Sequence, residues 1–153
     1  MQKTSPTFFQ IISTDYLAQN FFVLIFAGWF IYAIDAVFQG NNAFPLSIFS
    51  VICTLAGIVA FFWRYRLIVS TFVNGIEITG NITRVSTIST GRNRKDYIIH
   101  YEYHLNGQKY EYRNRIKKNS YAQTLRQDQP VNLLVHEKTP HLAFIKDIYL
   151  GYS

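Results

Sequence analysis

The hydrophobic and polar positions follow two different patterns, one before residue 64 and one after residue 75. In the first part, two long apolar segments cover residues 21–38 and 44–63, and between residues 16 and 63 the only charged residue is Asp35. About 20 helical residues are needed to cross a hydrocarbon core about 30 Å thick. The second segment reaches this length, and the first reaches it together with the uncharged residues 17–20. The pattern predicts two transmembrane helices.

The polar residues 39–42, with the sequence Gln-Gly-Asn-Asn, separate the two apolar segments. Pro45 follows them, and proline is common in the first turn of a helix. We therefore expect a tight transmembrane hairpin, in preference to the buried helix pair of a soluble protein. A secretory signal peptide is not expected, because residues 1–15 hold one Lys and no small-residue cleavage site follows a short apolar core.

From residue 76 onward, apolar and polar residues alternate as they do in half-buried strands. The first such segment covers residues 76–90, and Gly80 is the expected bend or bulge within it. A short helix is expected at residues 120–126, and two last strands at 131–136 and 142–145. About five strands in such a short chain indicate a small antiparallel domain, either barrel-like or a meander.

The clearest turn in this domain is Asn106-Gly107, between the alternating segments 97–105 and 108–116. This dipeptide is the strongest short-range signal for a two-residue β-hairpin turn. Such a turn predicts two cross-strand tyrosine pairs, Tyr103 with Tyr110 and Tyr101 with Tyr112. We expect these four tyrosines to line the core of the domain.

The segment between the two parts, residues 67–73, fits either a strand or the end of the second helix. The following Asn74-Gly75 suits either a hairpin turn or a left-handed helix stop. The helix is favoured, because nothing interrupts the apolar pattern after residue 63. The predicted organisation is an N-terminal cytoplasmic or interfacial segment (1–20), the transmembrane hairpin (21–63), a helical juncture (64–75) and a cytoplasmic β domain (76–153).

The average composition conceals these two parts. A net charge of +6 and a mean hydropathy of +0.04 together resemble a small nucleic-acid-binding domain. Aromatic residues at 17% exclude a disordered chain, and a single cysteine, Cys53, excludes a disulfide scaffold. Residues 1–63 carry a net charge of −1, whereas residues 64–153 carry +7.

The positive charges predict how the hairpin is oriented. The segment between the helices has no Lys or Arg, whereas Arg64 and Arg66 directly follow the second helix and Lys3 precedes the first. Cytoplasmic flanks of membrane helices carry an excess of Lys and Arg. We therefore expect an integral membrane protein, in a bacterial inner membrane, with both termini in the cytoplasm.

Several motifs of the β domain resemble a known family. The motifs are Gly75-x4-Gly80-x-Ile82, Tyr97-x-Ile99-x-Tyr101-x-Tyr103, Asn106-Gly107-Gln108-x-Tyr110 and Pro130-Val131-x-Leu133-x-Val135. Together with the hairpin, they resemble a widespread family of bacterial membrane proteins of unknown function, over roughly residues 21–145. The chain departs from its pattern at His136, where an aromatic residue is usual, and at Gln127-Asp128-Gln129, which lacks the usual glycine. The resemblance implies the architecture, and it implies no catalytic residues and no cofactor.

One constellation fits a metal ion by residue type. His100, Glu102 and His104 alternate along one predicted strand, so their side chains share a face. Histidines in this spacing can bind zinc. The alternative is a solvated polar face on which Glu102 pairs diagonally with Lys109 or Arg113. We favour the alternative, because nearby cations oppose a divalent metal, and we predict neither a metal site nor catalytic residues.

Two features of the hairpin bear on transport and packing. Asp35 is an ionisable residue in a membrane segment, where such residues are often functional. It lies three residues before the end of that segment, which favours a hydrated interfacial carboxylate. Small residues recur along the second helix at helical spacing, and the first helix offers Ala27, Gly28 and Ala33. Such stripes predict close helix packing within the hairpin, and self-association would use the same surface.

The cations of the second part are candidates for binding anionic lipid headgroups or a protein partner. They are Arg64, Arg66, Arg92, Arg94, Lys95, Arg113, Arg115, Lys117 and Lys118. Each cation near an anionic leaflet contributes about 1 kcal/mol to membrane attraction. Nucleic acid is the least expected partner, because the tyrosines that would stack on bases are assigned to the core.

The favoured hypothesis is a non-catalytic membrane protein whose β domain is an interaction or assembly module, binding an unknown partner or forming a homo-oligomer. A small oligomeric channel or transport accessory subunit is one alternative, motivated by Asp35 and the small-residue stripe. A membrane-tethered nucleic-acid binder is the other.

Overall fold

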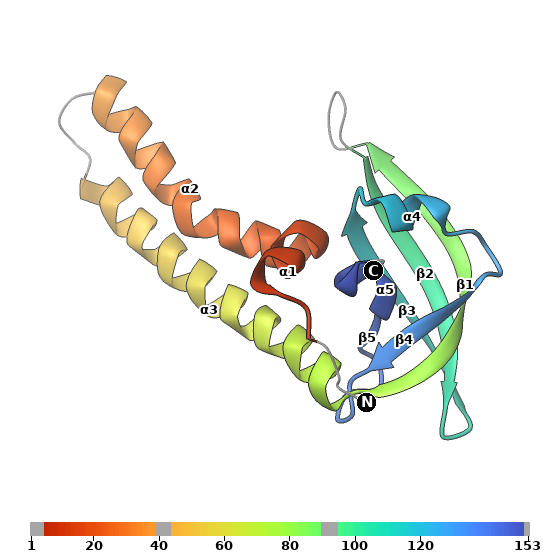
Figure 1. Ribbon diagram of the computed structural model, residues 1–153. Coiled ribbons are helices and arrows are strands. Elements are labelled where there is room, and N and C mark those ends of the chain that lie inside the picture. The colour runs from red at the N-terminus through yellow and green to blue at the C-terminus, as the bar shows by residue number, and fades with distance from the viewer. Residues whose placement is uncertain (1–4, 39–43, 90–94, 152–153) are drawn as a thin grey trace. The chain divides into compact units, whose positions relative to one another are not determined.

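The computed structural model describes residues 5–38, 44–89 and 95–151. The chain forms two compact units: Leu17–Arg66, which we call the hairpin unit, and Met1–Tyr16 together with Leu67–Ser153, which we call the β unit. Figure 1 shows the elements of both units. The residues that precede the hairpin thus join those that follow it in one unit.

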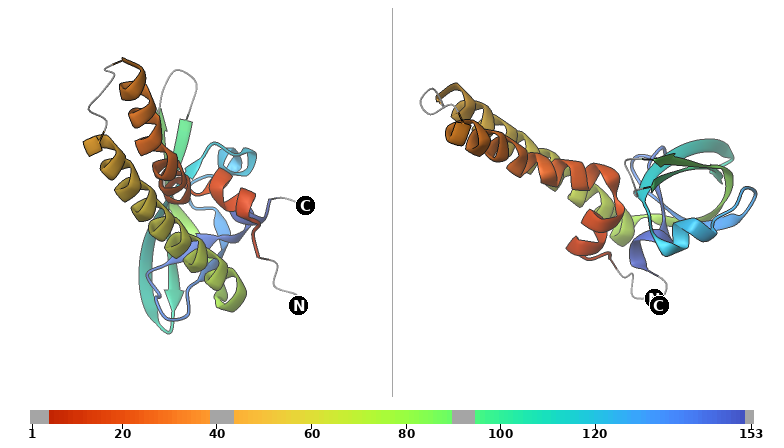
Figure 2. Two further views of the ribbon diagram at one scale, coloured as in Figure 1. Left: turned by 90° about the vertical axis from the view of Figure 1, so that its left-hand side faces the viewer. Right: turned by 90° about the horizontal axis from the view of Figure 1, so that it is seen from above.

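Two long helices make up the hairpin unit, α2 (Tyr16–Phe38) and most of α3 (Phe44–Asn74), and they run antiparallel (Figures 1 and 2). Both are long and apolar enough to cross a membrane, as the sequence predicted. Their apolar side chains face outward: Phe30 is 70% exposed, Val37 78% and Val59 69%. The predicted polar turn at 39–42 lies outside the described residues.

The two helices approach closely at Gly28. A Cβ atom there would lie 2.7 Å from the Cα atom of Ser50. Beside this point, the Thr54 hydroxyl donates a hydrogen bond to the Ile25 carbonyl at 2.9 Å and accepts one from Trp29 Nε1 at 2.9 Å. Small residues that let backbones approach and polar side chains that bond across helices are typical of packed membrane helices. The predicted packing of small residues within the hairpin is confirmed at Gly28 and Gly57, where an added Cβ atom would lie within 3.0 Å of the facing helix, whereas Ala33 is exposed.

The β unit is built on a five-stranded antiparallel sheet in the order β3-β2-β1-β4-β5. The sheet curls into a nearly closed barrel (Figure 2), which confirms the predicted fold class. The strands are β1 (Ile76–Ser89), β2 (Lys95–Leu105), β3 (Gln108–Lys117), β4 (Pro130–Val135) and β5 (Ala143–Ile145). The central strand β1 pairs with β4 through its first half and with β2 through its second half.

The predicted irregularity in β1 is present but lies beyond Gly80. Gly80 pairs with Val131 of β4, and the register against β2 shifts between Ile82 and Arg84. A Cβ atom on Gly80 would lie 2.7 Å from the Glu102 carbonyl oxygen, so glycine is needed for the close approach of two strands. The strand changes partner in this region: Asn81 pairs with Pro130 of β4 and with Glu102 of β2.

The β2–β3 hairpin has the predicted register. Asn106 and Gly107 have φ values of 52° and 78°, as a type I′ turn requires. Tyr103 lies opposite Tyr110, and Tyr101 lies opposite Tyr112, with ring centroids 5.7 and 5.9 Å apart. The two β2 tyrosines are buried, as expected, whereas the two β3 tyrosines are half-buried.

The buried tyrosine hydroxyls close the barrel toward β5. Tyr101 donates a hydrogen bond to the Ala143 carbonyl at 2.6 Å, and Tyr103 donates one to the Pro140 carbonyl. Burial, with the neighbouring Tyr112 and Tyr110, raises the pKa of Tyr103 to about 12. Tyr103 therefore stays protonated as a hydrogen-bond donor at pH values where an exposed tyrosine ionises.

Helix α3 continues to Asn74, so residues 67–73 are helical, the alternative that the sequence favoured. Its last turns contribute Ile68 and Phe72 to the core of the β unit. The helix does not end on a left-handed glycine, because the φ angle of Gly75 is not positive. Gly75 instead lies where a Cβ atom would be 2.2 Å from the Thr71 carbonyl oxygen and 2.8 Å from that of Val135.

Two short helices were not predicted. Helix α1 (Phe8–Thr14) starts with a capping box between Thr7 and Gln10, and helix α5 (Lys146–Leu150) follows β5. The predicted helix near residue 120 is α4 (Ser120–Thr124). Helix α1 contacts α5 and β3, so the N-terminal residues form part of the β unit core, with Ile11 fully buried.

A buried polar cluster connects α1, β3 and α5. The Tyr149 hydroxyl donates a hydrogen bond to Asp15 Oδ2 at 2.8 Å and accepts one from Asn114 Nδ2 at 3.2 Å. All three residues are less than 5% exposed. Asp15 also forms a backbone bridge with Ile116 of β3. Because buried polar groups are costly without partners, this cluster specifies how the N-terminal segment packs in the unit.

Candidate functional site

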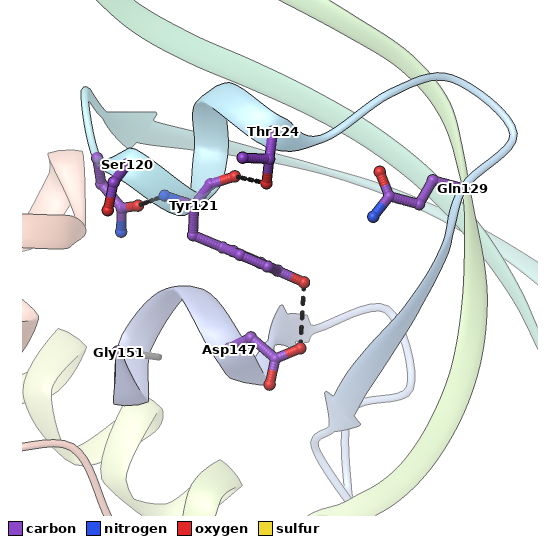
Figure 3. Close-up of a pocket in the computed structure, with 7 residues that line it drawn as sticks. Ser120, Tyr121, Thr124, Gln129, Asp147 and Gly151 are labelled. Carbon is purple, nitrogen blue, oxygen red and sulfur yellow. Dashed lines mark hydrogen bonds between the residues drawn. The ribbon is translucent and has the colours of Figure 1, made fainter. Parts of the chain in front are cut away.

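A pocket of about 440 Å³ opens between α4, α5 and the turn before β4 (Figure 3). This volume lies within the range of small-molecule sites, about 300–1,000 Å³. Its lining comes from three separate segments of the β unit. The lining residues are Asn119, Ser120, Tyr121, Thr124, Gln129, Asp147 and Gly151.

The wall formed by α4 is held in place by its N-cap. Asn119 Oδ1 accepts hydrogen bonds from the backbone N–H groups of Tyr121 and Ala122 at 2.7 and 3.1 Å. Its Nδ2 donates to the Ile148 carbonyl at 3.4 Å, which joins α4 to α5. Ala122 and the following Leu125 are buried beneath the helix. The short helix is therefore fixed against the barrel.

Tyr121 spans the pocket from α4 to α5. Its ring points across the opening, and its hydroxyl donates a hydrogen bond to Asp147 Oδ2 at 3.1 Å (Figure 3). Gln129 stands on the far side of the opening, where its Oε1 accepts a hydrogen bond from the Arg126 backbone at 2.9 Å. That bond orients the Gln129 side chain and leaves its Nε2 as a donor. Among the described lining residues, Asp147 is the only charged one.

This arrangement has the chemistry of a binding pocket. The Asp147 carboxylate can accept hydrogen bonds through Oδ1, and the Gln129 amide can donate them. The Thr124 hydroxyl donates to the Tyr121 carbonyl at 2.8 Å. The described lining contains no hydroxyl hydrogen-bonded to a histidine, the pair that activates a nucleophile. The pocket can therefore recognise a group that carries N–H or O–H donors.

The residues considered for a metal ion, His100, Glu102 and His104, lie on β2. Lys109 forms an ion pair with Glu102 at 2.7 Å, the diagonal contact that the sequence suggested, and a second with Glu111 at 3.4 Å. The hydrogen bond to Glu102 raises the pKa of Lys109 above its ordinary value. In the described part of the chain, no group of three or more His, Cys, Asp or Glu side chains is placed to hold a metal ion.

The candidate cations differ in exposure. Arg66, Arg113 and Lys118 are exposed, Lys117 is half-buried and Arg64 is buried. Arg92 and Arg94 lie outside the described residues, and Lys95 is the first residue of β2.

Arg115 has a structural role within the β unit. Its Nε and Nη2 atoms donate to Asp96 Oδ2 at 3.1 and 2.8 Å. The guanidinium lies 3.6 Å from the centroid of the Tyr16 ring. Planar stacking and a forked contact to one carboxylate suit arginine and not lysine.

Asp35 lies in the last turn of α2, three residues before Phe38, and is half-buried. This position is the helix end that the sequence indicated. The Asp35 carboxylate therefore lies near the edge of the apolar segment.

The pocket was not predicted from the sequence, because its lining comes from segments that are separate in the chain. Only Asn119-Ser120, which is typical of a helix start, was a local signal. No family model, curated protein or solved structure matches this chain.

Proposed function

We propose that this protein is a non-catalytic membrane protein in which the hairpin unit is the anchor and the β unit is an interaction module. The observation that carries the anchoring role is the outward-facing apolar surface of α2 and α3. In the most apolar 18-residue stretch of each helix, only 6% is buried for α2 and 17% for α3. A soluble protein buries such helices, whereas lipid solvates them.

Both termini are proposed to lie in the cytoplasm of a bacterial cell, with the hairpin in the inner membrane. The Lys and Arg residues that follow the second helix support this orientation. The chain segments that make up the β unit also support this orientation. Met1–Tyr16 precedes the hairpin, Leu67–Ser153 follows it, and both belong to one unit. Chain segments that pack together are on the same side of a membrane. The resemblance to bacterial hairpin-plus-β-domain proteins agrees with this proposal.

Cysteine labelling tests the anchor and its orientation. In a Cys53→Ala background, we expect Asn41→Cys to react with a membrane-impermeant maleimide in intact cells. Lys138→Cys, which replaces an exposed side chain of the β unit, should react only after permeabilisation. Ser120→Cys is a second exposed reporter in the same unit. Labelling of Lys138→Cys in intact cells would contradict the orientation, and release of the chain by alkaline carbonate would contradict the anchor.

The pocket beside Tyr121 supports the interaction role. It joins a rigid wall to a carboxylate that can accept further hydrogen bonds, and it is open to solvent at Thr124, which is exposed. Binding sites typically combine a concave surface with a few oriented polar groups. We propose that this pocket recognises a partner group with N–H or O–H donors.

Photo-crosslinking tests the interaction role in the native membrane. A photoreactive residue at Thr124 should give one discrete adduct, and the additional change Asp147→Asn should weaken it, because a neutral amide binds a donor group less strongly than a carboxylate. The matched control is the same photoreactive residue at Glu137, an exposed site in the turn after β4. Identical products at Thr124 and Glu137 would rule out recognition at the pocket.

A further inference from the structure

Helix α1 presents its more apolar face outward. On the inner face, Ile11 and Thr14 are buried, and Gln10 donates a hydrogen bond from Nε2 to the backbone of α5 at 3.3 Å. On the outer face, Phe8 is 39% exposed and Phe9 is 80% exposed. The two rings are in edge contact, with their centroids 5.7 Å apart. They therefore form one exposed aromatic patch.

A helix on the surface of a water-soluble domain normally has the opposite arrangement, with its apolar stripe toward the core. Ile12, one turn from Phe8, is half-buried, and Ser13, one turn from Phe9, is exposed. We call these four residues the outer face of α1. Exposed apolar patches mark contacts with a membrane, a ligand or another protein.

The chain leads directly from α1 into a proposed membrane helix. Asp15 alone separates Thr14, the last residue of α1, from Tyr16, the first residue of α2. Helix α2 has 23 residues, or about 35 Å, which is close to the thickness of the hydrocarbon core. Tyr16 therefore lies at the membrane surface when α2 spans the bilayer. A helical rise of about 1.5 Å per residue keeps Phe9 within roughly 15 Å of Tyr16.

Contacts within the β unit fix α1 close to the start of α2. Asp15 forms a backbone bridge with Ile116 of β3, and the Arg115 guanidinium lies over the Tyr16 ring. Helix α1 also packs against α5. The outer face of α1 therefore has a fixed place in the β unit, next to the residue at which α2 begins.

The charges beside this point favour an anionic lipid surface as the occupant. Lys117 and Lys118 directly follow Ile116, the residue bridged to Asp15, and Lys118 is exposed. Residues 64–153 carry a net charge of +7, so a second copy would bring like charge against the first. An anionic leaflet instead attracts each nearby cation by about 1 kcal/mol. Phenylalanine on one face with lysine beside it is typical of helices that lie in a membrane interface.

We propose that the outer face of α1 docks on an anionic membrane surface, with Phe8 and Phe9 between the headgroups and the acyl chains and Lys118 beside the headgroups. Interfacial helices bury their apolar face about 5–10 Å into this boundary. The inference deepens the proposed anchoring role and rests on it, because α1 lies at the membrane only if α2 spans it. It adds a second lipid contact, made by the β unit itself.

Quenching by brominated lipid tests the proposal on the full chain. The chain carries Cys53→Ala and a fluorescent label on Ser13→Cys, and it is reconstituted in vesicles of phosphatidylcholine and phosphatidylglycerol with brominated acyl chains. Bromine quenches at short range, so we expect the Ser13 label to be quenched. Phe9→Ser should weaken docking about tenfold and reduce the quenching, because one aromatic side chain leaves the lipid. Phe9→Trp should preserve the quenching, since tryptophan is favoured at membrane interfaces.

Matched controls separate this docking from the anchor. A label on Phe30→Cys, at an exposed position of α2, should be quenched in the bilayer. A label on Gln108→Cys should be quenched less, because this exposed residue lies at the other end of β3, roughly 27 Å from Ile116. Ile88→Ser, which removes another exposed apolar side chain of the β unit, should leave the Ser13 signal unchanged.

The possible failures are distinguishable. Quenching at Phe30 without quenching at Ser13 would overturn the inference and leave the anchor intact, whereas an unquenched Phe30 label would overturn the anchor. Quenching at Ser13 that Phe9→Ser leaves unchanged would also overturn the inference. So would quenching that disappears as the protein-to-lipid ratio rises, since a second copy would then cover the face. Vesicles without phosphatidylglycerol should quench the Ser13 label less, and equal quenching would overturn the preference for anionic lipid.

Discussion

Tyr149→Ala will destabilise the β unit by about 3–5 kcal/mol, the usual cost of truncating a large buried aromatic side chain. The ring is 1% exposed, and its centroid lies 5.6 Å from that of Phe72 and 5.5 Å from that of Phe144. The substitution also removes the hydroxyl that hydrogen-bonds to Asp15 and Asn114. Hydrogen exchange of peptides from the β strands measures this loss.

Tyr149→Phe separates the hydroxyl from the ring. It keeps the packing and leaves two buried polar groups with one partner fewer, which costs about 1–3 kcal/mol. Tyr112→Phe is the matched control, because the Tyr112 side chain is half-buried on the sheet. A Tyr149→Phe protein as stable as the wild type would show that the buried polar cluster does not stabilise the N-terminal segment.

Gly75→Ala will have the second large effect, about 3 kcal/mol of destabilisation, at the upper end of the usual cost of overpacking. The added Cβ atom would lie 2.2 Å from the Thr71 carbonyl oxygen and 2.8 Å from the Val135 carbonyl oxygen. Both contacts are with backbone atoms, so no side-chain rotation relieves them. The end of α3 must move relative to β4, and hydrogen exchange of the β1 and β4 peptides should report the loss.

Gly107→Ala is the matched comparison for Gly75→Ala. Gly107 has a φ of +78°, and a Cβ atom added there would meet nothing within 4 Å beyond its neighbours in the chain. Only the left-handed backbone opposes alanine there, at about 1 kcal/mol. Equal effects of the two substitutions would mean that steric contact is not the reason for glycine at position 75.

The parts of the fold that local signals specify were predicted from the sequence. The apolar length of α2 and α3 needs no tertiary information. The register of β2 and β3 follows from a two-residue turn, because that turn alone determines which residues are opposite. The end of α3 was placed correctly, but its cause was not: Gly75 is required by a contact with Val135, which is distant in sequence.

The remaining elements depend on contacts that no local pattern reveals. Helices α1 and α5 are too short for a hydrophobic period to be recognised. Asp15 is a charged residue beside a predicted membrane helix, and its burial depends on Tyr149, 134 residues away. The pocket depends on the same kind of contact, since Tyr121 and Asp147 lie 26 residues apart. Local signals therefore predicted the strands, the β2–β3 register and the two apolar helices, whereas long-range packing determines the strand order and the candidate site.

The burial of the N-terminal segment in the β unit has a consequence for synthesis. Ile11 and Asp15 leave the ribosome before the hairpin, whereas Tyr149 follows 134 residues after Asp15. At about 5–20 residues per second, this delay is on the order of 10 s. In the membrane arrangement proposed above, both helices insert during that time, while the first turns of the chain have no core to join. Completion of the β unit is therefore a late step, and the proposed orientation requires that the nascent N-terminus remain on the side of the membrane where the last strands emerge.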